Sequence, residues 1–225
     1  MIKDLGDTSP DLIFHGGDLA DSGSSPAEVI DQVRDLSWPG VLGNTDEVHT
    51  RPESLEEFAS QSSAPASLWA AVREMAAATH AALGEERVSW MRTLPLVQVH
   101  DFIALVHARP ESAWQSPGSG ASSAELENCY GPLNTPLVVF GHIHQPFIRT
   151  VHTANRKLTV ANTGSVSLSY DGDCRASYLL IDDGCPTIRR VEYDVEKEVR
   201  ALAASRLPYS DWVAGMLRAA KPLMP

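Results

Sequence analysis

Short apolar runs recur along this chain, and each gives way to polar side chains at its carboxyl end. The polar residues that follow the four runs are Asp18 and Asp21 in "GGDLAD", Asn44 and Asp46 in "GNTD", His107 in "VHARP", and His142 and His144 in "GHIH". Short, valine-rich runs followed by glycine predict buried strands. In an open α/β sheet the carboxyl ends of the strands meet at one edge, where ligands bind. We therefore expect an α/β fold that brings these side chains together.

The segment between the first two runs predicts a helix. Ser25 stands at the N-cap position, Pro26 at the first helical position, and Glu28 closes a capping box. One apolar stripe follows, formed by Val29, Ile30, Val33 and Leu36. With predicted strands at residues 12–14 and in "WPGVLGNTD", this order predicts a right-handed parallel βαβ unit.

A helical insertion is expected near the site over residues 47–92, although its first part, residues 47–66, is polar and predicts irregular structure. Residues 67–83 predict a helix up to Gly84, and a short helix follows. Its buried face is expected to hold Leu68, Val72, Met75, Thr79 and Leu83.

The remainder of the chain alternates between β signals and loops. "LVQVHDFIALVHARP" predicts two strands around a turn at His100 and Asp101, and the composition of residues 115–134 predicts a surface loop. Residues 158–193 are rich in β signals separated by Gly and Asp turns, and the tail predicts two helices divided near Pro208.

Length and charge limit the classes of function. A chain of 225 residues can form one domain, which we expect to span residues 1–225. The net charge of −11 disfavours a long surface for extended nucleic acid, because such surfaces depend on Lys and Arg, but a small anionic substrate held by metal ions is compatible with it. No apolar stretch could span a bilayer, "MIKDLGDTSPDL" lacks a signal-peptide pattern, and three scattered cysteines suit a reducing cytoplasm.

The polar residues at the strand ends are chemically suited to a metal centre. His142 and His144 are spaced i, i+2, so extended backbone places both on one side of the chain. Nitrogen and oxygen ligands without thiolate favour Mn, Fe, Zn, Co or Ni over a structural zinc site. Each fragment also has an ordinary explanation: Gly-Asp is a common turn, Asn44 tolerates left-handed backbone, and a single histidine is usually just hydrogen-bonded.

In this order the motifs resemble the calcineurin-like metallophosphoesterases, whose signature is D-x-H, G-D-x-x-D, G-N-H-D, a histidine after a strand, and G-H-x-H. "GDLAD", "GNTD", "VHARP" and "GHIH" match the last four, and "NTGSVSLSYDGDCRASYLLID" is similar to a segment of the small bacterial branch. The resemblance implies a layered α-β-β-α sandwich of two mixed sheets flanked by helices. It implies hydrolysis of a small phosphoester substrate, a phosphodiester or phosphomonoester, by hydroxide on two divalent ions.

The resemblance also assigns roles to individual residues. Asp18 would bridge two metal ions, Asn44, His107 and His142 would complete one of them, and His144 would serve the other. Asp21 and Asp46 would orient the ligands. Catalysis is then expected to depend on Asp18, Asn44, Asp46 and His107.

Two departures from the signature alter these expectations. Thr45 stands where the family has the histidine of G-N-H-D, so protonation of the leaving group lacks an imidazole. No D-x-H precedes "GGDLAD", and the sequence begins at "MIKDLGD" inside the helix expected after a first strand. Asp4 and Asp7 are expected to be surface residues of that helix, and the reduced ligand set is expected to hold one metal firmly and a second weakly.

A non-catalytic reading stays open beside the enzyme. The same architecture serves as a protein-interaction module in the retromer subunit, and the lost motifs are compatible with that function. The retained residues Asp18, Asn44, His107, His142 and His144 favour an enzyme, because a scaffold has no physical need for five convergent ligands. The substrate, the native metal and the oligomeric state do not follow from the sequence.

Overall fold

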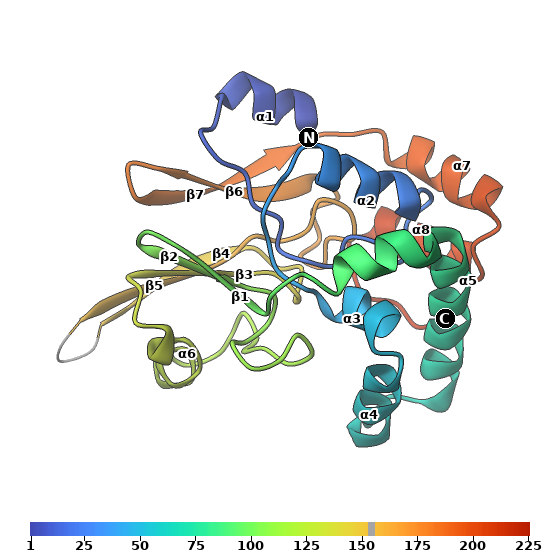
Figure 1. Cartoon of the computed structure of the whole chain (residues 1–225), viewed down its shortest axis with the longest axis horizontal. Coiled ribbons are helices and arrows are strands. Elements are labelled where there is room, and N and C mark those ends of the chain that lie inside the picture. Colours follow the sequence, from blue (N-terminus) through green and yellow to red (C-terminus); the bar gives the residue numbers. More distant parts are fainter. Residues whose placement is uncertain (153–155) are drawn as a thin grey trace.

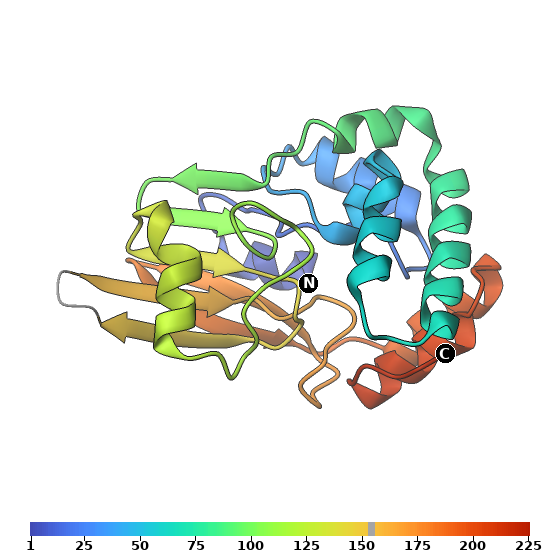
Figure 2. The ribbon, with the colours of Figure 1, turned by 90° about the horizontal axis from the view of Figure 1, so that it is seen from below.

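The protein is described by a computed structural model that covers residues 1–152 and 156–225 (Figures 1 and 2). Its strands are β1 (Val97–His100), β2 (Ile103–Val106), β3 (Leu137–Phe140), β4 (Phe147–His152), β5 (Lys157–Asn162), β6 (Ala176–Asp182) and β7 (Cys185–Val191). Its helices are α1 (Ile2–Thr8), α2 (Pro26–Asp35), α3 (Asn44–Thr50), α4 (Glu53–Gln61), α5 (Ala66–Met91), α6 (Ser123–Tyr130), the short 3-10 helix η1 (Gly131–Leu133), α7 (Val195–Ser205) and α8 (Ser210–Ala219).

The strands form two sheets. The larger sheet has the order β1-β2-β3-β5-β4, with β2, β3 and β5 parallel and both edge strands antiparallel to their neighbours. The smaller sheet is the antiparallel pair β6-β7, so only the larger of the two sheets is mixed, whereas both were expected to be. The predicted turn lies one residue later than expected, at Asp101 and Phe102, and Asp101 has a φ of 49°.

Strand β3 shows how the layers pack. Its side chains alternate between two cores: Val138 and Phe140 lie with Leu126 and Tyr130 of α6, while Leu137 and Val139 face the β6-β7 side. Figure 1 shows the resulting order, from α6 through the larger sheet and the β6-β7 pair to α1. This order confirms the predicted α-β-β-α sandwich.

Helix α1 confirms the helix expected at "MIKDLGD". Asp4, expected to be only a surface residue, accepts a hydrogen bond of 2.6 Å from the hydroxyl of Tyr178 in β6, whereas Asp7 is exposed.

The two strands predicted around α2 are wrong in detail. Their segments meet through a single parallel bridge between His15 and Gly40, where the His15 amide donates to Pro39 and the Val41 amide donates to His15. The glycines beside His15 and the missing amide hydrogen of Pro39 limit the ladder to this bridge.

Helix α2 begins after Ser25 as predicted, but within the described part of the chain the Ser25 side chain makes no capping hydrogen bond. Ile30 and Val33 are buried, whereas Val29 and Leu36 at the edges of the stripe are exposed.

The insertion is more helical than expected. Residues 47–66, predicted as irregular, contain most of α3 and all of α4. These short helices are stabilised by ion pairs of Arg51 with Glu47 and Glu57 and by the burial of Leu55. The prediction of irregular structure from polar composition alone was therefore wrong. Helix α5 follows as predicted, with Met75, Thr79 and Leu83 buried and non-helical backbone at Gly84.

Two further elements were missed. The predicted surface loop of residues 115–134 contains α6, which starts with a capping box in which the Ser122 hydroxyl accepts from the Glu125 amide. Strand β4 was not predicted.

The two tail helices α7 and α8 are confirmed and pack against Met75 of α5 (Figure 2). Within the described ranges, no helix combines the length and apolar character needed to span a membrane.

His49 gives a prediction about acid stability. It lies buried between α3 and α5, neither ring nitrogen has a hydrogen-bond partner among the described residues, and burial followed by the charge of His80 lowers its pKa to about 4. Because the unfolded chain takes up a proton near pH 6.5 and the folded chain does not, stability is lost as pH falls from 6.5 toward 4. We expect His49 to cost about 2 kcal/mol at pH 5 relative to pH 7.

Denaturant unfolding at pH 7 and pH 5 measures this cost. The His49→Leu protein should lose less stability than wild type between the two pH values, whereas replacing the exposed His100 with glutamine should leave the loss unchanged. An equal loss in wild type and His49→Leu would contradict the assignment.

Candidate active site

The polar residues predicted to converge do meet at one edge of the larger sheet. His107 follows β2, and His142 and His144 follow β3, so the parallel pairing of these strands sets their rings side by side. The His107 and His142 ring centroids are 5.3 Å apart. Asn44 opens α3, and its Oδ1 lies 3.1 Å from His107 Nε2 and 3.0 Å from His142 Nδ1.

Asp18 lies at the centre of this group. Its Oδ2 is 3.3 Å from His107 Nε2 and 3.9 Å from His144 Nε2. Its Oδ1 accepts hydrogen bonds of 3.0 Å from both the amide and the hydroxyl of Thr45. Burial favours the neutral acid, but His107 and His144 outweigh it and hold the Asp18 pKa well below its usual value.

Backbone carbonyls fix the tautomers of the two histidines that face Asp18. His107 Nδ1 lies 2.7 Å from the Gly16 oxygen and His144 Nδ1 lies 2.6 Å from the Leu168 oxygen. A carbonyl only accepts, so each Nδ1 carries a proton and each Nε2 faces Asp18 Oδ2. When Nε2 carries no proton, its lone pair repels the carboxylate unless a cation lies between them.

This donor set fits a divalent cation. Imidazole nitrogens with carboxylate and amide oxygens suit first-row transition metals, and the carbonyl partners at Nδ1 are the usual means of orienting ligating histidines. Among the described residues, however, no three His, Cys, Asp or Glu side chains already stand around one point as metal ligands do.

Asp46 holds the loop that carries Asp18. Its carboxylate accepts from the amides of Asp18 and Leu19 at 2.8 Å and from that of Gly43 at 3.0 Å. Burial, and then the charge of Asp18, raises the Asp46 pKa to about 6. Asp46 therefore positions the backbone of Asp18.

Asp21 differs from Asp46 in its hydrogen-bond partner. Its carboxylate accepts from the hydroxyl of Thr79 in α5 at 3.2 Å, and burial raises its pKa to about 6. The predicted role of Asp21 in orienting ligands stays a prediction.

Left-handed backbone occurs at three of the site residues. The φ angles are 55° at Asp18, 61° at His142 and 55° at His144. Asp and His tolerate this region better than most residues, and such conformations concentrate at functional sites.

Burial, and then the charge of His107, lowers the pKa of His142 to about 4, so this ring is neutral at pH 7.

Two contributors to the site were not assigned from the sequence. Asn162 is fully buried; its amide donates to the Gly141 carbonyl and accepts from the Gly164 amide, which ties the "GHIH" loop to the end of β5. Tyr170 stacks on His144 with ring centroids 4.8 Å apart. The similarity of "NTGSVSLSY" to a family segment was the available signal for both.

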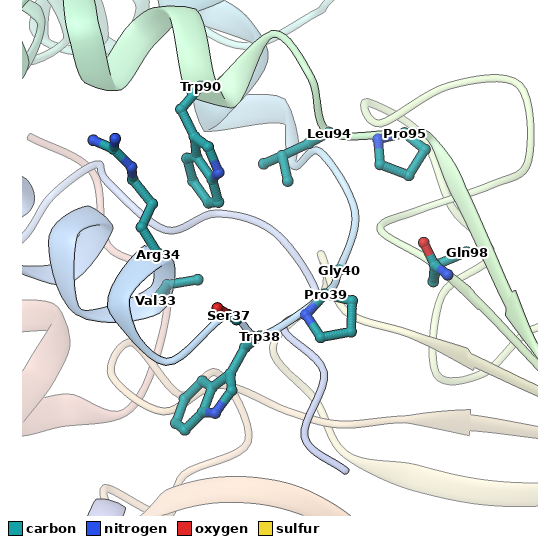
Figure 3. Close-up of a pocket in the computed structure, with 10 residues that line it drawn as sticks. All are labelled: Val33, Arg34, Ser37, Trp38, Pro39, Gly40, Trp90, Leu94, Pro95 and Gln98. Carbon is teal, nitrogen blue, oxygen red and sulfur yellow. The ribbon is translucent and has the colours of Figure 1, made fainter.

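A cavity of about 380 Å³ lies elsewhere, between the end of α2, the end of α5 and β1 (Figure 3). Trp38, Trp90 and Gly40 line it, and none of the predicted site residues does. It does not contribute to the cluster around Asp18.

Comparison with known proteins places this geometry in a family. The calcineurin-like phosphoesterase superfamily domain matches residues 1–183. An uncharacterized protein of Methanocaldococcus jannaschii is 27% identical over 236 aligned residues, which cover 96% of this chain and 90% of that protein.

Two solved structures share the fold. A metallophosphoesterase from Sphaerobacter thermophilus superposes with a TM-score of 0.76 at 21% identity, covering 97% of this chain and 93% of that one. A hypothetical protein from Pyrococcus horikoshii OT3 superposes with a TM-score of 0.79 at 17% identity, covering 99% and 91%. The chain belongs to the calcineurin-like phosphoesterase superfamily.

Proposed function

We propose that this protein is a metal-dependent phosphoesterase that hydrolyses phosphodiester or phosphomonoester bonds. The observation that carries the proposal is the arrangement around Asp18 Oδ2. The Nε2 atoms of two imidazole rings lie near this oxygen, and backbone carbonyls that accept from the Nδ1 atoms fix the orientation of both rings. Such a cluster stabilises a cation, and family membership supports phosphoester hydrolysis as the reaction class.

The side chains that would hold the ions are Asp18, Asn44, His107, His142 and His144. Bound divalent ions would supply positive charge that neutralises phosphoryl oxygens and lowers the pKa of an attacking water. Asp46 keeps the Asp18 loop in place, and the carbonyls of Gly16 and Leu168 keep His107 and His144 aimed at Asp18.

Thr45 influences which substrates suit the site. Its hydroxyl is engaged with Asp18 Oδ1, and a hydroxyl has no readily transferable proton near pH 7. A leaving group that needs no protonation should react fastest, and aryl esters are therefore the first substrates to test.

The proposal predicts hydrolysis that requires added metal. Protein stripped with chelator and dialysed should release p-nitrophenolate from bis(p-nitrophenyl) phosphate or p-nitrophenyl phosphate only after Mn²⁺, Fe²⁺, Zn²⁺, Co²⁺ or Ni²⁺ is restored. Elemental analysis of the same samples counts bound metal. Protein that binds metal but hydrolyses neither ester would contradict the enzyme and favour a protein-interaction module.

A further inference from the structure

A second cavity, of about 220 Å³, lies between the α3-α4 corner and the loop that follows His107. Phe58, Trp114, Ser54, Arg51 and Glu57 are among the residues that line it. The reaction proposed above has no use for any of them.

Helix α3 and two hydrogen bonds of Trp114 connect this cavity to the cluster around Asp18. Helix α3 runs from Asn44 toward Arg51, a span of about 10 Å at 1.5 Å per residue. The indole nitrogen of Trp114 donates to Glu47 of the same helix at 2.8 Å, and the backbone of Trp114 hydrogen-bonds to His142. The cavity is therefore positioned to receive a part of a substrate whose phosphoryl group lies at Asp18.

The aromatic side chains of the cavity are held in place before any ligand arrives. The rings of Phe58 and Trp114 lie 4.9 Å apart with a 33° tilt, and Trp69 packs edge-on against Phe58 at 5.8 Å. Glu47 fixes the orientation of the Trp114 ring. Fixed aromatic rings that remain partly exposed are a platform on which flat rings stack.

Ser54 adds a polar group that lacks a partner. Its side chain is 1% exposed, its Oγ has no hydrogen-bond partner among the described residues, and it lines the cavity. A buried hydroxyl without a partner is costly, so a ligand that hydrogen-bonds to it gains affinity. The edge of a heteroaromatic ring offers such a partner.

Charge compensation decides against an anionic occupant. Arg51 is paired with Glu47 at 2.8 Å and with Glu57 at 2.8 Å, so the cavity presents no unpaired positive charge from Arg51. A second phosphate group would meet two carboxylates beside one guanidinium. An uncharged ring is the better fit.

We propose that this cavity binds an uncharged heteroaromatic ring of the substrate, such as a nucleobase, by stacking on Phe58 and Trp114 and by a hydrogen bond to Ser54. The inference rests on the proposed function and narrows its substrates to phosphoesters that carry the ring on a spacer. An aryl ring attached to the phosphate through a single ester oxygen is too short to reach this cavity from Asp18 along the length of α3. A base joined to the phosphate through a ribose can reach it.

Two esters with the same leaving group test the proposal. Thymidine 5′-(p-nitrophenyl) phosphate and methyl p-nitrophenyl phosphate both release p-nitrophenolate, so they differ only in the group offered to the cavity. We expect wild type to prefer the thymidine ester, and Phe58→Leu to lower kcat/KM for that ester about tenfold while changing the methyl ester less than about twofold. Ser54→Ala should act in the same direction, and Phe102→Ala, at an exposed ring in the β1-β2 turn, should change neither.

A binding measurement separates failure of this inference from failure of the proposed function. Titration of the full chain with thymidine or adenosine, followed by tryptophan fluorescence, needs no catalysis; wild type should bind, and Phe58→Leu should bind about tenfold more weakly. If Phe58→Leu lowered kcat/KM equally for both esters, the inference would be overturned. Absence of nucleoside binding to wild type at millimolar concentration would overturn it as well. Nucleoside binding without hydrolysis of either ester would support the cavity and overturn the enzyme.

Discussion

Replacing Asp18 with asparagine is expected to lower kcat/KM for phosphoester hydrolysis by more than about 100-fold. Loss of a residue that merely orients a metal ligand costs about 10 to 100-fold, and Asp18 is itself the carboxylate that His107 and His144 face. His142→Ala should have a comparable effect. Steady-state kinetics and metal analysis on the same preparations provide the measurement.

The fold should survive these changes, because neither removes buried apolar volume. Asparagine retains an oxygen that can accept from Thr45, and circular dichroism should show unchanged helix content. Asp211→Asn, at an exposed position in α8, is the matched control and should be fully active. Activity within a few-fold of wild type for Asp18→Asn, with metal content unchanged, would disprove the assignment of the site.

Gly43→Ala is expected to produce a large loss of stability. A Cβ at Gly43 would lie 2.2 Å from the Asp18 backbone nitrogen and 2.3 Å from Asp18 Oδ1. That nitrogen cannot withdraw freely, because Asp46 holds it at 2.8 Å. Overlap of backbone with a new methyl group should cost about 3 kcal/mol and lower Tm by roughly 6–12 °C.

Thermal melting of Gly43→Ala beside Gly6→Ala tests this steric account. A Cβ at Gly6 in α1 meets no atom of the described residues within 4 Å beyond its chain neighbours and its own helix backbone, so that substitution should be neutral or slightly stabilising. If Gly43→Ala melts with wild type, the close approach of the two loops does not exist in solution.

The sequence predicted the part of the site that depends on where strands end. His107, His142 and Asn44 were placed together because apolar runs preceding polar residues mark the carboxyl edge of a sheet, and the structure brings them within hydrogen-bonding distance. Their roles as metal ligands stay predictions. Asn162 was not assigned, because its contribution depends on the "GHIH" loop folding back against the end of β5.

Local patterns failed where tertiary contacts decide the structure. Residues 12–14 have strand propensity but form no strand; a single bridge follows them at His15, because the partner segment contains Pro39 and Gly40. The helix α6 was hidden within a composition typical of loops, and its start is set by the capping box at Ser122 together with the burial of Leu126. Propensity summed over a window registers neither kind of contact.

The contacts that build the site also determine when it can form during folding. Asp18 and Thr45 are 27 residues apart in sequence, Gly16 and His107 are 91 apart, and Asn44 and His142 are 98 apart. Closing such long loops is entropically costly and slow, so these groups meet only after the parallel strands have paired. A chain still folding offers an ion no more than a local pair such as His142 and His144. Any ion that the protein holds therefore binds at the end of folding. It slows unfolding of the folded chain and does not accelerate the folding steps that precede its binding.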